Sequence, residues 1–84
     1  MVSGLVQGVG YRAFAARVAG NHRLVGGVRN LNDGRVEVDV EGEKAVIQAL
    51  VVELKAGPPG SDVQKIEIEW SPSTNRFSSF RIWY

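Results

Sequence analysis

Three glycines and an arginine mark the stretch of this sequence best suited to chemistry, which reads Gly4-Leu5-Val6-Gln7-Gly8-Val9-Gly10-Tyr11-Arg12. Glycine lets the backbone take positive φ values and lets a ligand approach the main chain closely. Successive N–H groups in such a loop can converge on an anion. A helix that begins there adds unpaired N–H groups and the positive end of its dipole. The stretch therefore predicts a phosphate-binding loop.

Arg12 closes this stretch at the point where a helical pattern begins. Its planar guanidinium can donate to two phosphate oxygens at once, which suits it to clamp a phosphate held by the loop. The stretch is not a Walker loop, because no Lys-Ser/Thr pair follows, and its glycine spacing is not that of a dinucleotide-binding loop. On glycine spacing alone, a plain strand-to-helix turn with a solvated Arg12 is the alternative interpretation.

The complete string resembles the signature of the acylphosphatases, small enzymes that hydrolyse carboxyl–phosphate anhydrides. The matching pattern is Gly4-x-Val6-Gln7-Gly8-Val9-x-Tyr11-Arg12. Further segments are similar to the family's second block and to its later landmarks, namely Gly26-Gly27-Val28-Arg29-Asn30, Asp33-Gly34-x-Val36-Glu37, Gly42, Gly57-Pro58-Pro59 and Phe80-Arg81-Ile82. The resemblance covers essentially the whole chain and implies one acylphosphatase-like domain over residues 1–84.

The resemblance also implies roles for particular residues. Arg12 is expected to bind the substrate phosphate and Asn30 to position the attacking water, so these two are the expected catalytic residues. Backbone amides of the loop from Leu5 onward are expected to surround the phosphate oxygens. The expected phosphate-binding residues are Val6, Gln7, Gly8, Val9, Gly10, Tyr11 and Arg12. The side chains of Gln7 and Tyr11 are expected to shape the loop, and neither a metal nor a cofactor is expected.

An arginine and an asparagine are chemically sufficient for this reaction. The carboxylate of an acyl phosphate is already a good leaving group, so neither a strong base nor a metal is obligatory. The remaining tasks are to position the water and to stabilise the phosphoryl oxygens. Asn30 can orient a water through its side-chain amide without titrating.

Hydrophobic periodicity predicts the elements that must position these residues. From Tyr11 the apolar positions repeat at i, i+3, i+4 and i+7, which indicates an amphipathic helix ending near Gly20-Asn21. Strict alternation of valines with charged residues over 35–41 indicates a half-buried strand, and Asn32-Asp33-Gly34 indicates the hairpin turn before it. In chain order we predict strand 1–6, helix 11–21, strand 24–30, strand 35–41, helix 43–56, strand 63–70, loop 71–75 and strand 80–84.

The inward faces of two later segments follow from the same patterns. In the second helix the predicted inward residues are Val46, Ala49, Leu50 and Leu54, and Gly57-Pro58-Pro59 ends the helix. In the strand over 63–70 the predicted inward residues are Ile66, Ile68 and Trp70. The order of elements predicts an α+β fold, a ferredoxin-like βαββαβ sandwich with an antiparallel sheet of four to five strands and both helices on one face.

The composition excludes several other classes of protein. The chain has 84 residues and no cysteine, which excludes disulfides and sulfur-based zinc sites. A formal net charge of +1 lacks the basic surplus that is typical of nucleic-acid binding. The apolar runs are too short to span a membrane, and no secretory signal opens the sequence. From the composition we expect a cytoplasmic monomer without nucleic-acid or membrane partners, and the resemblance implies that it acts on a small acyl phosphate.

The sequence departs from the family pattern in two places. Only Met1-Val2-Ser3 precede Gly4, where the family usually carries several more residues of the first strand. Marginal stability, or exchange of a strand with a neighbouring chain, is therefore expected. Gly27 stands where the family often has Trp or Tyr, which predicts the loss of a packing ring near Asn30.

Two further functions are compatible with the pattern. One is a carbamoyl-phosphate-handling domain of the kind that begins hydrogenase-maturation factors, where a proline often follows the motif's arginine; this sequence has Ala13 there. The other is a non-enzymatic ferredoxin-like module that binds a ligand or RNA. RNA binding needs exposed aromatic side chains on the sheet, whereas the strands here alternate valine or isoleucine with acids.

Overall fold

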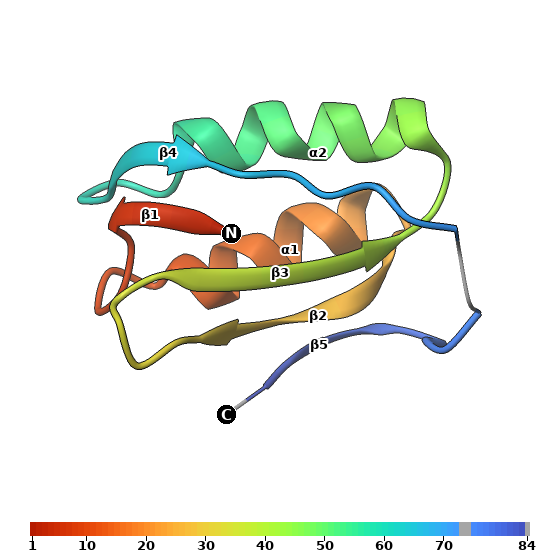
Figure 1. The fold of residues 1–84 in the computed structure, drawn as a ribbon, viewed down its shortest axis with the longest axis horizontal. Coiled ribbons are helices and arrows are strands. Elements are labelled where there is room, and N and C mark those ends of the chain that lie inside the picture. The colour runs from red at the N-terminus through yellow and green to blue at the C-terminus, as the bar shows by residue number, and fades with distance from the viewer. Residues whose placement is uncertain (73–74, 84) are drawn as a thin grey trace.

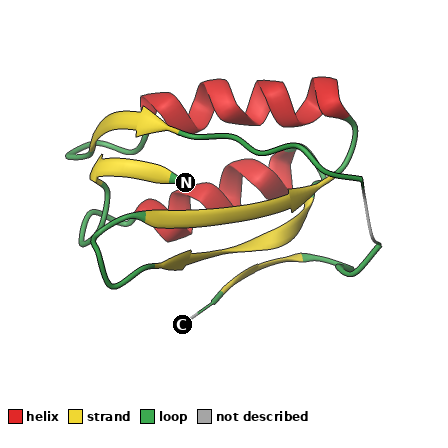
Figure 2. Ribbon diagram, viewed as in Figure 1, coloured by secondary structure: helices red, strands yellow, loops and turns green. Residues whose placement is uncertain are grey.

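The computed structural model describes residues 1–72 and 75–83. Both helices cover one face of a single sheet (Figures 1 and 2). The elements in chain order are β1 (Val2–Leu5), α1 (Tyr11–Asn21), β2 (Val25–Asn30), β3 (Val36–Glu41), α2 (Lys44–Ala56), β4 (Asp62–Ile66) and β5 (Phe80–Ile82). The predicted βαββαβ order and the ferredoxin-like fold class are confirmed.

The five strands lie in the order β4-β1-β3-β2-β5, so β1 and β3 are central neighbours as expected. β1 pairs antiparallel with β3 and β4, and β2 pairs antiparallel with β3. β5 instead pairs parallel with β2, so the prediction of a wholly antiparallel sheet was wrong. β5 follows a long connection from the opposite edge of the sheet and therefore joins β2 in the same direction rather than through a hairpin (Figure 1).

The hairpin of β2 and β3 forms around the predicted turn. Gly34 has a φ of 92°, a backbone conformation that favours glycine. Asp33 accepts a hydrogen bond from the backbone N–H of Arg35 at 3.1 Å and another from its Nε at 2.8 Å. These contacts, the backbone hydrogen bond first, lower the pKa of the Asp33 carboxyl. The turn keeps β2 and β3 in register from Val25↔Glu41 to Asn30↔Val36.

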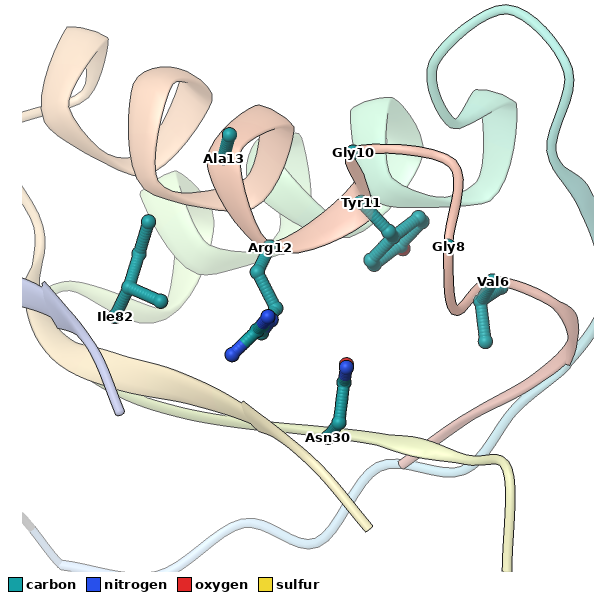
Figure 3. A pocket seen from close by; sticks show the side chains of 8 residues that line it. All are labelled: Val6, Gly8, Gly10, Tyr11, Arg12, Ala13, Asn30 and Ile82. Atoms are coloured by element: carbon teal, nitrogen blue, oxygen red, sulfur yellow. The ribbon is translucent and has the colours of Figure 1, made fainter. Parts of the chain in front are cut away.

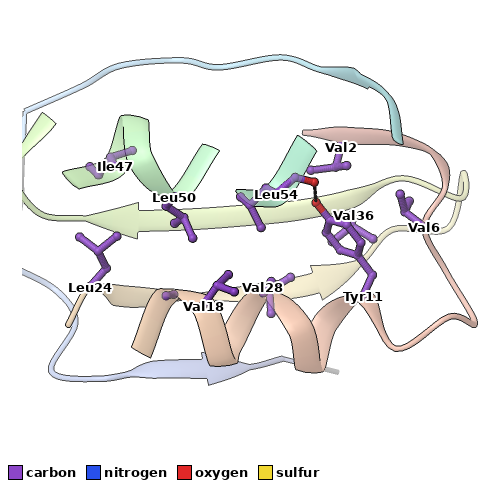
Figure 4. Close-up of a cluster of buried hydrophobic side chains, with 12 residues drawn as sticks. Val2, Val6, Tyr11, Val18, Leu24, Val28, Val36, Ile47, Leu50 and Leu54 are labelled. Atoms are coloured by element: carbon purple, nitrogen blue, oxygen red, sulfur yellow. Dashed lines mark hydrogen bonds between the residues drawn. The ribbon is translucent and has the colours of Figure 1, made fainter. Parts of the chain in front are cut away.

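The hydrophobic core lies between the sheet and the two helices (Figure 4). Tyr11 is the largest of its fully buried side chains, and its hydroxyl donates to the Leu54 carbonyl at 2.8 Å, which joins α1 to α2. The buried residues are Val2, Val6, Tyr11, Ala15, Val18, Ala19, Leu24, Val28, Val36, Ile47, Leu50 and Leu54.

The inward face of α2 differs by part of a turn from the prediction. Ile47, Leu50 and Leu54 are buried, whereas Ala49 is exposed. Ile47 to Leu54 spans i, i+3 and i+7, and Val46 and Val51 flank that stripe as partly buried residues. Apolar residues lie on both sides of Leu50 in the sequence, so two faces of the helix could point inward. Packing against the sheet determines which of them is buried. The predicted end of the helix is confirmed, because the Gly57 N–H bonds to the Glu53 carbonyl at 3.1 Å.

β4 ends at Ile66, four residues before the predicted strand end. Ile68 and Trp70, predicted to point inward, are 46% and 47% exposed. The cause is the length of β1, since pairing along this edge reaches only Met1, whose carbonyl accepts the Glu67 N–H at 2.9 Å. The predicted loop at 71–75 includes residues 73 and 74, and the predicted last strand includes residue 84; these three residues lie outside the described part of the chain.

Candidate active site

The loop between β1 and α1 turns sharply at two of its glycines. Gly8 and Gly10 both have φ values of 76°, in the left-handed region that favours glycine. Val6 before the loop and Tyr11 after it are almost fully buried, so both ends of the loop are anchored in the core. The loop itself is exposed at Gly8 and Gly10, which leaves its backbone open to a ligand.

Gly10 is also the residue before α1, and it provides no side chain to cap the helix. The Phe14 N–H bonds to the Gly10 carbonyl at 3.0 Å, so the amides before Phe14 precede the regular helical hydrogen bonds. No acidic residue occupies the first turn of α1. The positive end of the helix dipole therefore remains available to an anion at the loop.

A cavity of about 230 Å³ lies beside the loop, between α1 and the ends of β2 and β5 (Figure 3). The Arg12 guanidinium enters it from the first turn of α1, and the Asn30 amide enters it from the end of β2. Its lining residues are Val6, Gly8, Gly10, Tyr11, Arg12, Ala13, Asn30 and Ile82.

Most of the expected site residues meet at this cavity. The structure places Arg12 and Asn30 together there with four of the expected phosphate-binding residues, Val6, Gly8, Gly10 and Tyr11. Gln7 and Val9 do not line it. Sequence reasoning missed Ala13 and Ile82. Ala13 follows Arg12 in the first turn of α1, a position that the helical pattern could have indicated, whereas no local signal marks Ile82.

The Arg12 guanidinium is half-buried and is held by a hydrogen bond to the segment that follows β5. Its Nη1 donates to the Trp83 carbonyl at 3.3 Å, just after β5. The Trp83 N–H in turn donates to the Val28 carbonyl at 2.8 Å, which extends the pairing of β5 with β2. The position of Arg12 therefore depends on the predicted last strand, whose parallel pairing with β2 was not predicted.

Gln7 connects the loop to the β2–β3 turn. Its side-chain amide donates to the Leu31 carbonyl at 2.7 Å and to the Arg35 carbonyl at 3.0 Å. Leu31 directly follows Asn30, so this pair of hydrogen bonds couples the loop to the strand end that carries the site asparagine. The expectation that the Gln7 side chain shapes the loop is consistent with these contacts.

Tyr11 supports the loop from inside the core. Its hydroxyl bonds to the Leu54 carbonyl at 2.8 Å, and burial raises the pKa of the Tyr11 phenol above its ordinary value. The hydroxyl thus stays neutral at physiological pH, so we assign it a structural role rather than one in proton transfer.

The ring expected to be missing at Gly27 is supplied by Trp83. A Cβ built at Gly27 would overlap the Trp83 indole, so the indole lies directly on the Gly27 backbone. Phe77 packs on the same ring with a centroid distance of 5.8 Å. Residue 27 itself lacks a packing ring, but the indole of Trp83, the residue directly after β5, covers its backbone.

Two properties of the described residues bear on other functions. No three His, Asp or Glu side chains among residues 1–72 and 75–83 gather closely enough to hold a metal ion. Within the same residues, neither helix combines the length and the apolar character needed to cross a membrane.

Comparison with known proteins agrees with the fold and the signature. A family model described as acylphosphatase matches residues 1–82. The curated acylphosphatase of Anaeromyxobacter dehalogenans (strain 2CP-C) is 46% identical over 82 residues, which cover 98% of this chain and 88% of the relative. The crystal structure of acylphosphatase from Bacillus subtilis matches with a TM-score of 0.95 and 41% identity, over 99% of this chain and 92% of that chain.

A larger protein contains a similar segment. The crystal structure of T. kodakarensis HypF matches with a TM-score of 0.85 and 37% identity over 98% of this chain, but the match covers only 11% of HypF. The curated relative and the B. subtilis structure are instead matched over most of their own length. With a family model that spans residues 1–82, this chain belongs to the acylphosphatase family.

Proposed function

We propose that this member of the acylphosphatase family hydrolyses the carboxyl–phosphate bond of small acyl phosphates in the cavity beside the glycine loop. The observation that carries the proposal is the meeting of the Arg12 guanidinium and the Asn30 amide in one cavity at the positive end of α1 (Figure 3). The products are a carboxylate and inorganic phosphate. Membership of an enzyme family makes a non-enzymatic module the weaker interpretation.

The glycine loop and Arg12 bind the phosphoryl group. Amides of residues 6–11 donate to the phosphoryl oxygens, and the guanidinium adds a positive charge with paired donors. The turns at Gly8 and Gly10 support this role, because left-handed φ values redirect successive N–H groups toward one side of the loop. Charge that develops on the phosphoryl oxygens is thereby stabilised by groups that are already in place.

Asn30 orients the water that attacks phosphorus. Its side-chain amide offers both a donor and an acceptor and stays neutral over the working pH range. The water attacks in line with the leaving carboxylate, and positioning provides most of the catalytic effect. The proton lost by the water passes to phosphate oxygens or solvent, because Tyr11 and Arg12 are the only titratable residues that line the cavity in the described part of the chain.

The cavity favours small substrates. Its volume of about 230 Å³ lies below the range of roughly 300–1,000 Å³ that is usual for drug-sized ligands. Val6, Ala13 and Ile82 give it an apolar wall that can contact the acyl group. We propose that the enzyme works as a cytoplasmic monomer without a cofactor, in keeping with a cysteine-free chain of 84 residues.

The direct test is hydrolysis of benzoyl phosphate by the purified chain in the presence of a metal chelator. We expect turnover without metal, and a loss of about 10²–10³-fold in kcat/KM for Arg12→Ala, the effect of removing one charge-stabilising donor. The matched control is Arg17→Ala, an exposed arginine of the same helix. Unchanged hydrolysis by a folded Arg12→Ala variant would remove Arg12 from the site.

A further inference from the structure

The cavity beside the glycine loop has an apolar end. Figure 3 shows Ala13 and Ile82 on one side of the Arg12 guanidinium. The loop glycines Gly8 and Gly10 lie on its other side. A phosphoryl group bound by the loop and Arg12 would occupy the glycine side, so the remainder of the substrate has the opposite side available. We define the apolar end as Ala13 and Ile82.

Ile82 forms the fixed part of the apolar end. It lies opposite Val28 in the parallel pairing of β5 with β2, and the next residue, Trp83, donates its N–H to the Val28 carbonyl at 2.8 Å. The Ile82 side chain is half-buried and packs on the hydrophobic core. Backbone pairing and core contacts therefore hold one aliphatic surface at the cavity.

Ala13 forms the open part of the apolar end. It is the third residue of α1, and it is exposed, with only a methyl group beside the cavity. A methyl group leaves room for a substrate between the helix and Ile82, whereas a longer side chain would reduce that room. The residue at position 13 therefore limits the size of the group that fits there.

The proposed chemistry directs the acyl group toward the helix. Asn30 lies at the end of β2 and points into the cavity from the sheet (Figure 3). A water bound to Asn30 attacks phosphorus from that side, and in-line displacement expels the carboxylate on the opposite side. The first turn of α1, which includes Ala13, bounds the cavity there.

The apolar end has no cation of its own among the described residues. Arg12 is the only charged residue that lines the cavity in that part of the chain, and the phosphoryl group takes its charge. Arg29 of β2 is exposed and donates to Glu37 at 2.8 Å. Arg81 alternates with Ile82 along β5 and therefore faces the other side of the sheet. A carboxylate at the apolar end would lose hydration without gaining a cation.

The volume of the cavity limits the length of the acyl group. The whole cavity measures about 230 Å³, and the phosphoryl group takes part of this space. A cavity of about 150 Å³ can enclose a benzene molecule. The remaining space therefore suits a short aliphatic chain or a single ring rather than a long acyl chain.

We propose that Ala13 and Ile82 determine substrate specificity, and that they select acyl phosphates whose acyl group is short, apolar and uncharged. Contacts with Ile82 favour an apolar chain, and Ala13 leaves room for it. A substrate that carries a second carboxylate at the end of its acyl group is disfavoured. This inference rests on the proposed function, since it concerns the same cavity.

The test compares butanoyl phosphate with succinyl phosphate, whose acyl groups have equal numbers of carbon atoms but end in a methyl group and a carboxylate, respectively. We expect kcat/KM to be higher for butanoyl phosphate by about 10-fold, an effect typical of leaving a buried polar group unpaired. Equal values, or a preference for succinyl phosphate, would overturn the inference and leave the proposed function standing. No hydrolysis of these two compounds or of benzoyl phosphate would overturn the proposed function and the inference with it.

Substitutions of Ala13 test that residue, and its exposed position makes them compatible with folding. Ala13→Lys should shift the ratio of the two kcat/KM values toward succinyl phosphate by about two- to five-fold, the range for an exposed ion pair. Ala13→Met, of similar length but uncharged, should not shift the ratio in that direction. The matched control is Ala45→Lys, an exposed alanine near the start of α2 and outside the cavity. No shift with Ala13→Lys, or an equal shift with Ala45→Lys, would overturn the role of Ala13.

Substitutions of Ile82 test the fixed part of the apolar end. Ile82→Ala should reduce the preference for butanoyl phosphate over acetyl phosphate by about four-fold for each methylene group of the substrate that loses its contact. Ile82→Val should reduce the same preference by a smaller factor and disturb the core less. Urea unfolding shows that each variant is folded. An unchanged ratio in both folded variants would overturn the role of Ile82.

Discussion

Arg12 and Asn30 reach the same cavity from different layers of the molecule. Arg12 comes from the helix that follows the loop, and Asn30 comes from the last position of β2. The arginine offers paired charged donors, and the asparagine offers a neutral donor and acceptor. At the scale of single residues, the site depends on where these two side chains are held.

Replacing Asn30 should impair catalysis but leave phosphate binding nearly unchanged. Asn30→Ala removes the group that we assign to the water, so kcat for benzoyl phosphate should fall about 10²–10³-fold. Inhibition by inorganic phosphate should be little changed, because the loop and Arg12 remain. Steady-state kinetics measures both quantities, and Asn32→Ala in the exposed turn is the control. An equal loss of phosphate inhibition would assign Asn30 to phosphate binding instead.

Replacing Gln7 should loosen the contact between the loop and the β2–β3 turn. Gln7→Leu removes two hydrogen bonds and leaves the carbonyls of Leu31 and Arg35 without that partner. We expect the free energy of unfolding to fall by about 1–3 kcal/mol and kcat to fall with it, since Asn30 is adjacent to Leu31. Urea unfolding measures the first effect. Gln48→Leu, an exposed glutamine of α2, should leave both quantities nearly unchanged.

The residues of the site divide into those that the sequence indicates and those that it does not. Arg12 and Asn30 belong to strings with a recognisable pattern, so the amino-acid sequence alone pointed to two residues that the structure brings into one cavity. Ile82 and the Trp83 carbonyl reach the site only because β5 pairs with β2 in one particular register. That register depends on long-range packing, for which residues 80–83 carry no local signal.

At the scale of elements, Gly27 of β2 lies against the indole of Trp83, the residue directly after β5. Gly27→Ala places a methyl group inside the Trp83 indole and should lower the free energy of unfolding by about 1–3 kcal/mol. Gly20→Ala is the matched control: no neighbour lies within 4 Å of its added Cβ. Because Gly20 lies within α1, this change should stabilise the chain by up to about 1 kcal/mol.

A double variant tests whether the Trp83 indole is the reason why Gly27→Ala lowers the free energy of unfolding. In a Trp83→Ala background, Gly27→Ala should lower the free energy of unfolding clearly less than it does as a single substitution, because the overlapping ring is gone. Thermal or urea unfolding of the unmodified chain, the two single variants and the double variant gives the coupling energy between the two positions. Additive effects would mean that the Gly27 backbone, rather than the Trp83 ring, requires a glycine.

Alternation predicts which face of a segment is apolar, but it does not predict where a strand ends. The pattern over residues 63–70 is regular, yet β4 stops at Ile66. A strand also needs a partner at each position, and the pairing along this edge ends at Met1, just before β1. Likewise, the apolar residues of α2 allow two inward faces, and only packing against the sheet decides between Ala49 and Ile47.

At the scale of the whole molecule, the sheet has two unlike sides. The cavity that we propose as the catalytic site is bounded by complete elements, and the signature pattern of its loop made it predictable. The hollow of about 990 Å³ between β3 and the segment after β4 could not be predicted in detail, because it depends on how far β1 extends between them. Its apolar floor is the α2 face that holds the core together, so filling this hollow should affect the stability of the entire fold.

Extending β1 in the same chain should therefore stabilise the molecule. Lys-Val-Arg-Val added before Met1 places two valines on α2, worth roughly 3–6 kcal/mol together, and adds ladder hydrogen bonds of about 1 kcal/mol each. Ordering four residues costs about 1–2 kcal/mol per residue. We expect a net gain of about 1–3 kcal/mol in the free energy of unfolding over a Gly-Ser-Gly-Ser extension of equal length.

The same extension should leave catalysis unchanged. Urea unfolding and benzoyl phosphate hydrolysis of the two extended chains measure both effects. Equal stability of the two chains would show that the space between β3 and the segment after β4 does not accept a strand in the register of β1.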